Sequence, residues 1–281
     1  MIASVSKTKE ILSKYELQAK KRFGQNFLID GNVVSKIIKT ANINKETTVI
    51  EIGPGIGAMT ELLAKEAKEV ICFEIDKDMV EIITNEVINN GVDNVTVNEM
   101  DFLKVNLDDY KFCGNRVIVV SNLPYYITTP IIFKLLNEEI VSEIYVMVQD
   151  EVGRRLVGLP GTKDYGSLSV MIKFLADAKF EFKVGRNCFL PAPNVESAIV
   201  SIKRIKNDYS LKNESKFLKF VQIIFEMRRK TLVNNLLKSF SFERTFLEEK
   251  FNEINIDIGC RAESLTLNEM VNIFKILGLD K

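Results

Sequence analysis

The sequence predicts an α/β protein with a mixed, mostly parallel sheet followed by a small all-helical domain. Between residues 30 and 145, short β-rich runs alternate with amphipathic helical stretches, which is typical of a parallel sheet with helices on both faces. Beyond residue 205 no further β-rich run occurs, and Leu, Ile and Phe recur at helical spacing. The length of 281 residues also exceeds the roughly 100–200 residues of one domain. We therefore expect a sheet domain over residues 1–205 and a helical domain over residues 206–281.

The expected elements follow in chain order. Five β-rich runs predict strands at Thr48–Ile52, Glu69–Glu74, Val95–Glu99, Arg116–Ser121 and Glu143–Val148. Between them, helical periodicity predicts helices near Asp30–Ala41, Gly57–Lys65, Lys77–Asn89 and Thr129–Leu136. A helix at Asp150–Leu156 and an antiparallel pair at Ala178–Val184 and Ser197–Arg204 then complete a sheet of about seven strands. The second domain is expected to contain helices at Glu214–Phe225, Lys230–Phe240 and Leu267–Leu277.

Charge and residue usage exclude several classes of function. Lysine plus arginine equal aspartate plus glutamate at 38 each, so any RNA-binding surface has to come from local clusters. Histidine is absent, which removes the commonest general base and the most frequent transition-metal ligand. The four cysteines form no CxxC pair, and we therefore expect neither a metal site nor a disulfide framework. No stretch approaches the ~20 apolar residues of a membrane span, so we expect a cytoplasmic protein without membrane contact.

A glycine-rich turn follows the first predicted strand. Gly53, Gly55 and Gly57 lie between that strand and a helix, where small residues let the backbone approach a nucleotide-like ligand. Glu74 ends the next strand, where a carboxylate can accept both hydroxyls of a ribose. The two features predict an adenosine-containing cofactor, and their spacing fits a dinucleotide as well as S-adenosylmethionine. Asp101, just after the third strand, can accept from an adenine amine and favours S-adenosylmethionine.

The most specific motif is Asn122-Leu123-Pro124-Tyr125, directly after the fourth strand. An adenine amine is a poor nucleophile because its lone pair is delocalised into the ring, so an enzyme has to orient it with hydrogen-bond acceptors. The side-chain carbonyl of Asn122 and the backbone carbonyl of Leu123 can each accept one amine hydrogen. Pro124 fixes the turn, and Tyr125 can stack on an extruded base, which is worth roughly 1–3 kcal/mol. This motif predicts methylation at an adenine amine.

With these motifs the chain resembles the ribosomal RNA adenine dimethyltransferases, and among them the bacterial small-subunit enzymes linked to antibiotic resistance. The resemblance is carried, in order, by Arg22–Leu28, Glu51–Gly55, Asn122–Tyr125 and Phe189–Ser197. It implies a Rossmann-like, class I S-adenosylmethionine-dependent methyltransferase domain and a small helical domain that binds RNA. It also implies that the cofactor contacts Asn26, Leu28, Gly53, Glu74, Asp101 and Asn122.

The reaction that the resemblance implies is dimethylation of two adjacent adenosines in the 3′-terminal hairpin loop of 16S rRNA. The partner would be the small ribosomal subunit or its precursor, with a role in ribosome biogenesis, and the protein would act as a monomer. Phosphate contacts are expected from local basic clusters, which are Lys20–Arg22, Arg154–Arg155 and the family-like Arg228, Arg229 and Lys230. Phe189 is expected to offer a second aromatic face to the flipped base.

Three alternatives remain open at the level of sequence. A large-subunit adenine methyltransferase of the macrolide-resistance type shares the N-terminal motif and the Asn-x-Pro-Tyr site. A non-catalytic ribosome-assembly factor could keep the fold. A nicotinamide-dependent oxidoreductase fits the glycine turn but leaves Asn122–Tyr125 unexplained.

Overall fold

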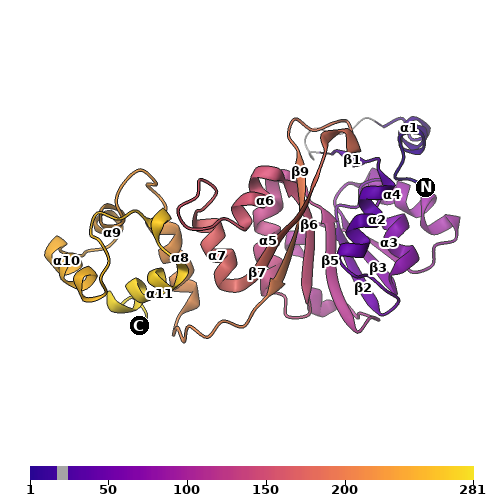
Figure 1. The fold of residues 1–281 in the computed structure, drawn as a ribbon. Helices are drawn as coiled ribbons and strands as arrows, with labels where there is room; N and C mark the ends of the chain where they lie inside the picture. The colour runs from indigo at the N-terminus through magenta and orange to yellow at the C-terminus, as the bar shows by residue number, and fades with distance from the viewer. Residues whose placement is uncertain (18–24) are drawn as a thin grey trace. The chain divides into compact units, whose positions relative to one another are not determined.

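The computed structural model describes residues 1–17 and 25–281. Its main feature is a seven-stranded sheet with the strand order β4-β3-β2-β5-β6-β9-β7 (Figure 1). The strands are β2 (Thr47–Ile52), β3 (Glu69–Glu74), β4 (Val95–Glu99), β5 (Arg116–Asn122), β6 (Glu143–Gln149), β7 (Ala176–Val184) and β9 (Ser197–Arg204). Neighbours from β4 to β6 are parallel, whereas β9 runs antiparallel to β6. The predicted mixed, mostly parallel α/β fold is confirmed.

The chain forms two compact units, which we describe separately. The first comprises residues 1–153 and 179–204, and the second comprises residues 154–178 and 205–281. The helices that begin in the first unit are α1 (Val5–Lys14), α2 (Gly31–Thr40), α3 (Thr60–Glu66), α4 (Lys77–Glu86), α5 (Thr128–Asn137) and α6 (Asp150–Leu156). Asp30 and Asp76 cap the starts of α2 and α4 by accepting backbone N–H bonds, as aspartate does at many helix starts.

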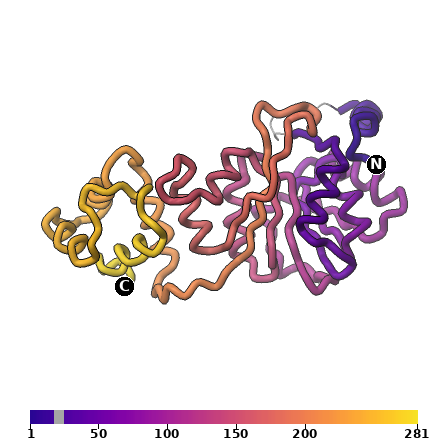
Figure 2. The backbone as a smooth tube through the Cα atoms, in the orientation of Figure 1, coloured from indigo at the N-terminus to yellow at the C-terminus, as the bar shows by residue number. Residues whose placement is uncertain are grey.

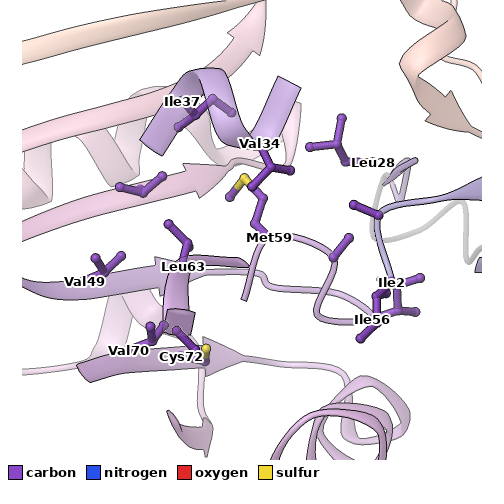
Figure 3. Close-up of a cluster of buried hydrophobic side chains, with 14 of the residues drawn as sticks. Ile2, Leu28, Val34, Ile37, Val49, Ile56, Met59, Leu63, Val70 and Cys72 are labelled. Carbon is purple, nitrogen blue, oxygen red and sulfur yellow. The ribbon is translucent and has the colours of Figure 1, made fainter. Parts of the chain in front are cut away.

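The central strands of the first unit are buried on both faces, and their alternating side chains enter two apolar layers. One layer contains Val49, Val70 and Cys72 of the strands together with side chains of α2 and α3 (Figure 3). On the opposite face, the ring of Phe73 lies 5.4 Å from that of Phe102 in an edge contact. These two layers hold the carboxyl ends of β2, β3 and β5 in fixed positions.

The N-terminal segment packs on the first unit and was not predicted as structured. Helix α1 buries Ile11 completely, and Lys14 and Tyr15 donate hydrogen bonds of 2.5 and 3.1 Å to the carboxylate of Glu86. Farther on, β1 (Phe27–Leu28) pairs antiparallel with β8 (Phe189–Leu190). This two-stranded sheet joins two segments that lie far apart in the sequence.

The second unit is helical and has an aromatic core. Its helices are α7 (Ser167–Leu175), α8 (Glu214–Ile224), α9 (Leu232–Ser239), α10 (Arg244–Glu253) and α11 (Leu267–Ile276), most of which form the orange-to-yellow part of the tube in Figure 2. The ring of Phe174 in α7 lies 4.9 Å from that of Phe217 in α8, which in turn lies 5.4 Å from Phe274 of α11. Burial of Phe174 among these rings explains why α7 belongs with the C-terminal helices.

The structure corrects several expected boundaries. Helix α3 begins at Thr60 rather than Gly57, because the backbone at Gly57 is left-handed with φ of 85°. Helix α4 ends at Glu86, and a short 3-10 helix follows at Ile88–Asn90. The contacts also place residues 154–178 with the helical unit, whereas the sequence suggested a single boundary at residue 205.

None of the helices in the described part of the chain is long and apolar enough to cross a membrane.

Candidate active site

The candidate active site is a cavity of about 290 Å³ in the first unit, at the carboxyl ends of β2, β3 and β5. Open α/β sheets bind their ligands at this edge. The cavity is lined by all the residues that the sequence assigned to the cofactor and to the Asn-Leu-Pro-Tyr motif, which are Asn26, Leu28, Gly53, Glu74, Asp101, Asn122, Leu123, Pro124 and Tyr125. The fold therefore brings five separate segments of the chain to one place.

The turn after β2 presents backbone to this cavity. Gly53 and Gly55 have φ angles of 67° and 59°, in the left-handed region that favours glycine. The Gly53 N–H donates to the carbonyl of Phe73 over 2.9 Å, which ties the turn to β3. A Cβ atom at Gly55 would lie 3.5 Å from the ring of Phe27. That is an ordinary contact distance, so the left-handed backbone at Gly53 and Gly55 is what favours glycine in this turn.

Glu74 ends β3 and is only 6% exposed as a residue. Its Oε2 accepts from the Gly55 N–H at 3.2 Å, and its Oε1 accepts from the Ile75 and Asp76 N–H groups at 2.8 and 2.9 Å. Burial raises the pKa of this carboxyl, although the three backbone hydrogen bonds act in the opposite direction. The side chain is therefore a fixed acceptor, and each carboxylate oxygen can accept a further bond from a ligand hydroxyl.

A second buried carboxyl, Glu51 of β2, also lines the cavity and is 1% exposed. Its Oε2 accepts from the hydroxyl of Thr60 at 2.7 Å and from the thiol of Cys72 at 3.8 Å. Burial raises the pKa of Glu51 to about 8, because desolvation outweighs these two hydrogen bonds. In the free protein this carboxyl is mostly neutral at pH 7.

An apolar wall completes the part of the cavity next to Glu74. It consists of Ile75, Met100, Phe102 and Leu103. Asp101 lies among them and caps a short 3-10 helix, where its Oδ1 accepts from the Leu103 N–H at 3.0 Å. This wall was not predicted, although its members directly follow Glu74 or flank Asp101 in the sequence. Apolar residues next to a predicted polar contact at a strand end are the signal that could have identified them.

The Asn-Leu-Pro-Tyr motif forms the end of β5 and the start of a 3-10 helix at Tyr125–Ile127. The side-chain NH₂ group of Asn122 donates to the backbone carbonyl of Asn26 over 3.3 Å, which leaves the side-chain carbonyl as its acceptor. The Tyr125 hydroxyl and the Ser197 hydroxyl lie 2.9 Å apart, within hydrogen-bond distance. Burial raises the pKa of Tyr125, so the phenol is neutral at physiological pH. The turn therefore holds one amide acceptor and one anchored aromatic ring at the cavity.

The segment before α2 closes the cavity on another side. Gln25, a member of the Arg22–Leu28 motif with no predicted role, lines the cavity and donates from Nε2 to Asp76 Oδ2 over 3.0 Å. Leu28 is 3% exposed and pairs with Phe189 across the small two-stranded sheet. The bonds at Gln25 and Asn26 connect this wall to the loop after β3 and to the end of β5.

Phe189 lies away from the cavity, and Arg228 makes hydrogen bonds within the second unit. Phe189 is 3% exposed, belongs to the apolar core and is absent from the cavity lining, because its position in β8 turns its ring inward. Arg228, in the second unit, donates to the backbone carbonyls of Lys163 and Tyr165 at 3.3 and 3.0 Å. It therefore ties two parts of that unit together.

The other residues of the predicted basic clusters are either exposed or outside the described part of the chain. Arg229 and Lys230 are exposed, and so are Arg154 and Arg155 of α6. The cluster Lys20–Arg22 and the first part of the N-terminal motif lie outside the described residues. Phosphate contacts at the exposed clusters stay predictions.

Comparison with known proteins identifies the relatives of the chain. Residues 16–278 match the family described as ribosomal RNA adenine dimethylase. A ribosomal RNA small subunit methyltransferase A from Bacillus cereus is 45% identical over 289 residues, which covers 100% of this chain and 98% of the relative. The protein of that name from Bacillus anthracis has the same identity and coverage. The predicted resemblance to this family is confirmed.

Solved structures agree in fold. A dimethyladenosine transferase from Plasmodium falciparum superposes with a TM-score of 0.76 at 23% identity and covers 90% of this chain and 98% of its own. The 23S rRNA methyltransferase ErmE superposes with a TM-score of 0.66 at 25% identity and covers 90% of this chain and 100% of its own. The methyltransferase fold predicted for the chain is thereby confirmed. On the sequence match, the full-length relatives and the shared fold, this chain belongs to the ribosomal RNA adenine dimethylase family.

Proposed function

We propose that this protein uses S-adenosylmethionine to dimethylate the exocyclic amines of two adjacent adenosines in the 3′-terminal hairpin loop of 16S rRNA. One observation carries the proposal. A single cavity joins the glycine turn and Glu74, which suit an adenosine-containing cofactor, to the Asn122–Tyr125 turn, which suits an adenine amine. The family membership and the 45% identity to small-subunit methyltransferases support the same reaction.

The residues present fit S-adenosylmethionine. The carboxylate of Glu74 is placed to accept ribose hydroxyls, and Ile75 and Phe102 offer apolar faces for an adenine ring. Gly53 and Gly55 keep the turn free of side chains, so the backbone can lie against the ligand. When bound, the cofactor supplies an electrophilic methyl group on its sulfonium. The volume of about 290 Å³ is near the lower end of ligand pockets, roughly 300–1,000 Å³.

The chain's own residues act on the target base. The side-chain carbonyl of Asn122 and the backbone carbonyl of Leu123 each accept one amine hydrogen, which turns the nitrogen lone pair toward the methyl donor. The bond from Asn122 to the carbonyl of Asn26 fixes the orientation of that amide. The ring of Tyr125, held by its contact with Ser197, stacks on the extruded adenine and offsets part of the cost of extracting it. Transfer would break the sulfur–methyl bond of the cofactor and form a nitrogen–methyl bond. The methylated nitrogen is then strongly acidic and releases its proton to solvent, so no histidine or strong base is needed.

The remaining contacts concern the ribosomal partner. We place the phosphate contacts of the second unit at Arg229 and Lys230. Arg228 is also exposed, but its guanidinium donates to two backbone carbonyls and lies 3.6 Å from the carboxylate of Glu263. In this proposal the helical region binds the small subunit or its precursor in the cytoplasm, and the protein acts as a monomer.

The test is methyl transfer to ribosomal subunits. Labelled S-adenosylmethionine is incubated with the protein and with small subunits isolated without their adenine methylation, and large subunits are treated in parallel. Dimethyladenosine confined to the small subunit is the expected product, identified by mass spectrometry of nucleosides. Label in the large subunit alone would assign the protein to the macrolide-resistance type, and absence of label from both would favour a non-catalytic assembly role.

A further inference from the structure

An exposed tyrosine lies at the rim of the cavity, next to the residue that holds the target base. Tyr126 is 61% exposed and still lines the cavity. Three further large apolar residues on the lining are also exposed, which are Ile75 at 53%, Met100 at 43% and Leu103 at 39%. Those three residues belong to the apolar wall beside Glu74 that suits the cofactor. Tyr126, in contrast, directly follows the Asn122–Tyr125 turn that suits the target base.

The two neighbouring tyrosines point in different directions. They begin the 3-10 helix Tyr125–Ile127, in which consecutive side chains lie about 120° apart at three residues per turn. Tyr125 turns inward, and its hydroxyl lies 2.9 Å from that of Ser197. The Tyr126 hydroxyl has no hydrogen bond to any residue in ranges 1–17 and 25–281. Its ring is thus available at the mouth of the cavity.

The substrate explains why such a ring is useful. When one of two adjacent adenosines is drawn into the cavity, its neighbour on the strand loses a stacking partner. An aromatic ring beside the mouth can replace that partner, because stacking on an aromatic side chain tolerates any base. We propose that Tyr126 stacks on the nucleotide adjacent to the adenosine in the cavity, an assignment that rests on the proposed function. Tyr125 and Tyr126 would then hold two consecutive nucleotides.

The inference predicts a specific pattern of kinetic effects. Tyr126→Ala is expected to raise the KM for unmethylated small subunits by about five- to thirty-fold, the lower part of what one base stack contributes. The affinity for S-adenosylmethionine and the kcat at saturating subunits should stay within about twofold. Tyr126→Phe should retain the wild-type KM, because stacking needs the ring and not the hydroxyl.

The matched control is Ile140→Ala. Ile140 is 44% exposed and precedes β6, so it lies toward the edge of the sheet opposite the cavity. All variants are measured with unmethylated small subunits and labelled S-adenosylmethionine, and cofactor binding is followed by calorimetry. A KM for Tyr126→Ala equal to that of the wild type, or a Tyr126→Phe variant as impaired as Tyr126→Ala, would overturn the stacking role while wild-type transfer continued. Failure of the wild-type protein to methylate small subunits would instead overturn the proposed function and this inference with it.

Discussion

The side-chain carbonyl of Asn122 offers the most direct test of the proposed chemistry. Asn122→Ala removes one of the two acceptors that orient the target amine and leaves the backbone carbonyl of Leu123 in place. It also removes the donor to the carbonyl of Asn26, a neutral bond of 3.3 Å. The variant therefore separates an effect on the reacting amine from a small effect on the cavity wall.

The two effects differ in size. Loss of one preorganised polar group at a reacting centre typically lowers kcat by about 10²–10³-fold, or about 2.7–4 kcal/mol. Loss of a long, neutral hydrogen bond costs about 1 kcal/mol or less, so S-adenosylmethionine affinity should fall by no more than about fivefold. We expect kcat for Asn122→Ala to fall at least a hundredfold while cofactor affinity is nearly retained.

Single-turnover methyl transfer to unmethylated small subunits measures the first quantity, and calorimetry with S-adenosylmethionine measures the second. Asn98→Ala is the matched control, because Asn98 of β4 also donates one side-chain amide bond to a backbone carbonyl, that of Cys72 at 3.2 Å, and does not line the cavity. An Asn122→Ala variant with turnover within threefold of Asn98→Ala would refute the orienting role. A loss of cofactor binding as large as the loss of turnover would show that Asn122 acts on the cavity wall instead.

Three further predictions follow from the buried carboxyls and the arginine cluster. Glu74→Gln should weaken S-adenosylmethionine binding by about ten- to a hundredfold, since a hydrogen bond to a charged group is worth about 1.5–3 kcal/mol. Glu69→Gln, at the other end of β3, is the control and should leave the affinity for S-adenosylmethionine unchanged. If calorimetry gave the two variants the same loss of affinity, Glu74 would not bind the ribose. Burial raises the pKa of Glu51 from 4.5 to about 8, so the native state binds a proton that the unfolded state releases, and stability falls as pH rises from about 5 to 8. Urea unfolding of Glu51→Gln should show a flatter pH dependence than wild type over this range, and parallel curves would exclude a raised pKa. Arg228→Ala should lower the unfolding free energy by about 1 kcal/mol, because two backbone carbonyls lose their donor. Arg229→Ala should leave stability unchanged, weaken binding to small subunits and reduce the salt dependence of that binding. Loss of stability in Arg229→Ala together with weaker subunit binding in Arg228→Ala would refute these roles.

Strands β2, β3, β5 and β6 could be predicted closely because their apolar, β-branched runs are almost wholly buried, and β4, of which only Val95 is buried, because its Val-Thr-Val run is β-rich. Strands β2 to β6 begin and end within one residue of the expected positions. Helix α10 was missed because only Leu247 and Phe251 of its ten residues are buried, which leaves a weak apolar pattern. Helix α1 was missed for the same reason, with Thr8 and Ile11 as its buried residues.

The site could be predicted where its residues follow strand ends, since the parallel strands bring their carboxyl ends to one edge. This principle places Gly53, Glu74, Asp101 and Asn122 at one cavity without further information. The position of a residue relative to a strand end does not predict which distant group a long side chain contacts in the folded protein. Arg228 looked like a phosphate ligand in a run of three basic residues, and only the fold shows its guanidinium against backbone carbonyls.

Pairing of β1 with β8 has a consequence for how the protein is made. The strand that carries Leu28, next to Asn26, pairs with Phe189 and Leu190, which leave the ribosome about 160 residues later. At a synthesis rate of ~5–20 residues per second, this interval lasts roughly 8–30 seconds. During that time the nascent chain gains the glycine turn and then the Asn122–Tyr125 motif, but it still lacks the segment that pairs with its own N-terminal strand. The segment that carries Asn26 and Leu28 can therefore gain its β-pairing behind the cavity only after β8 has emerged.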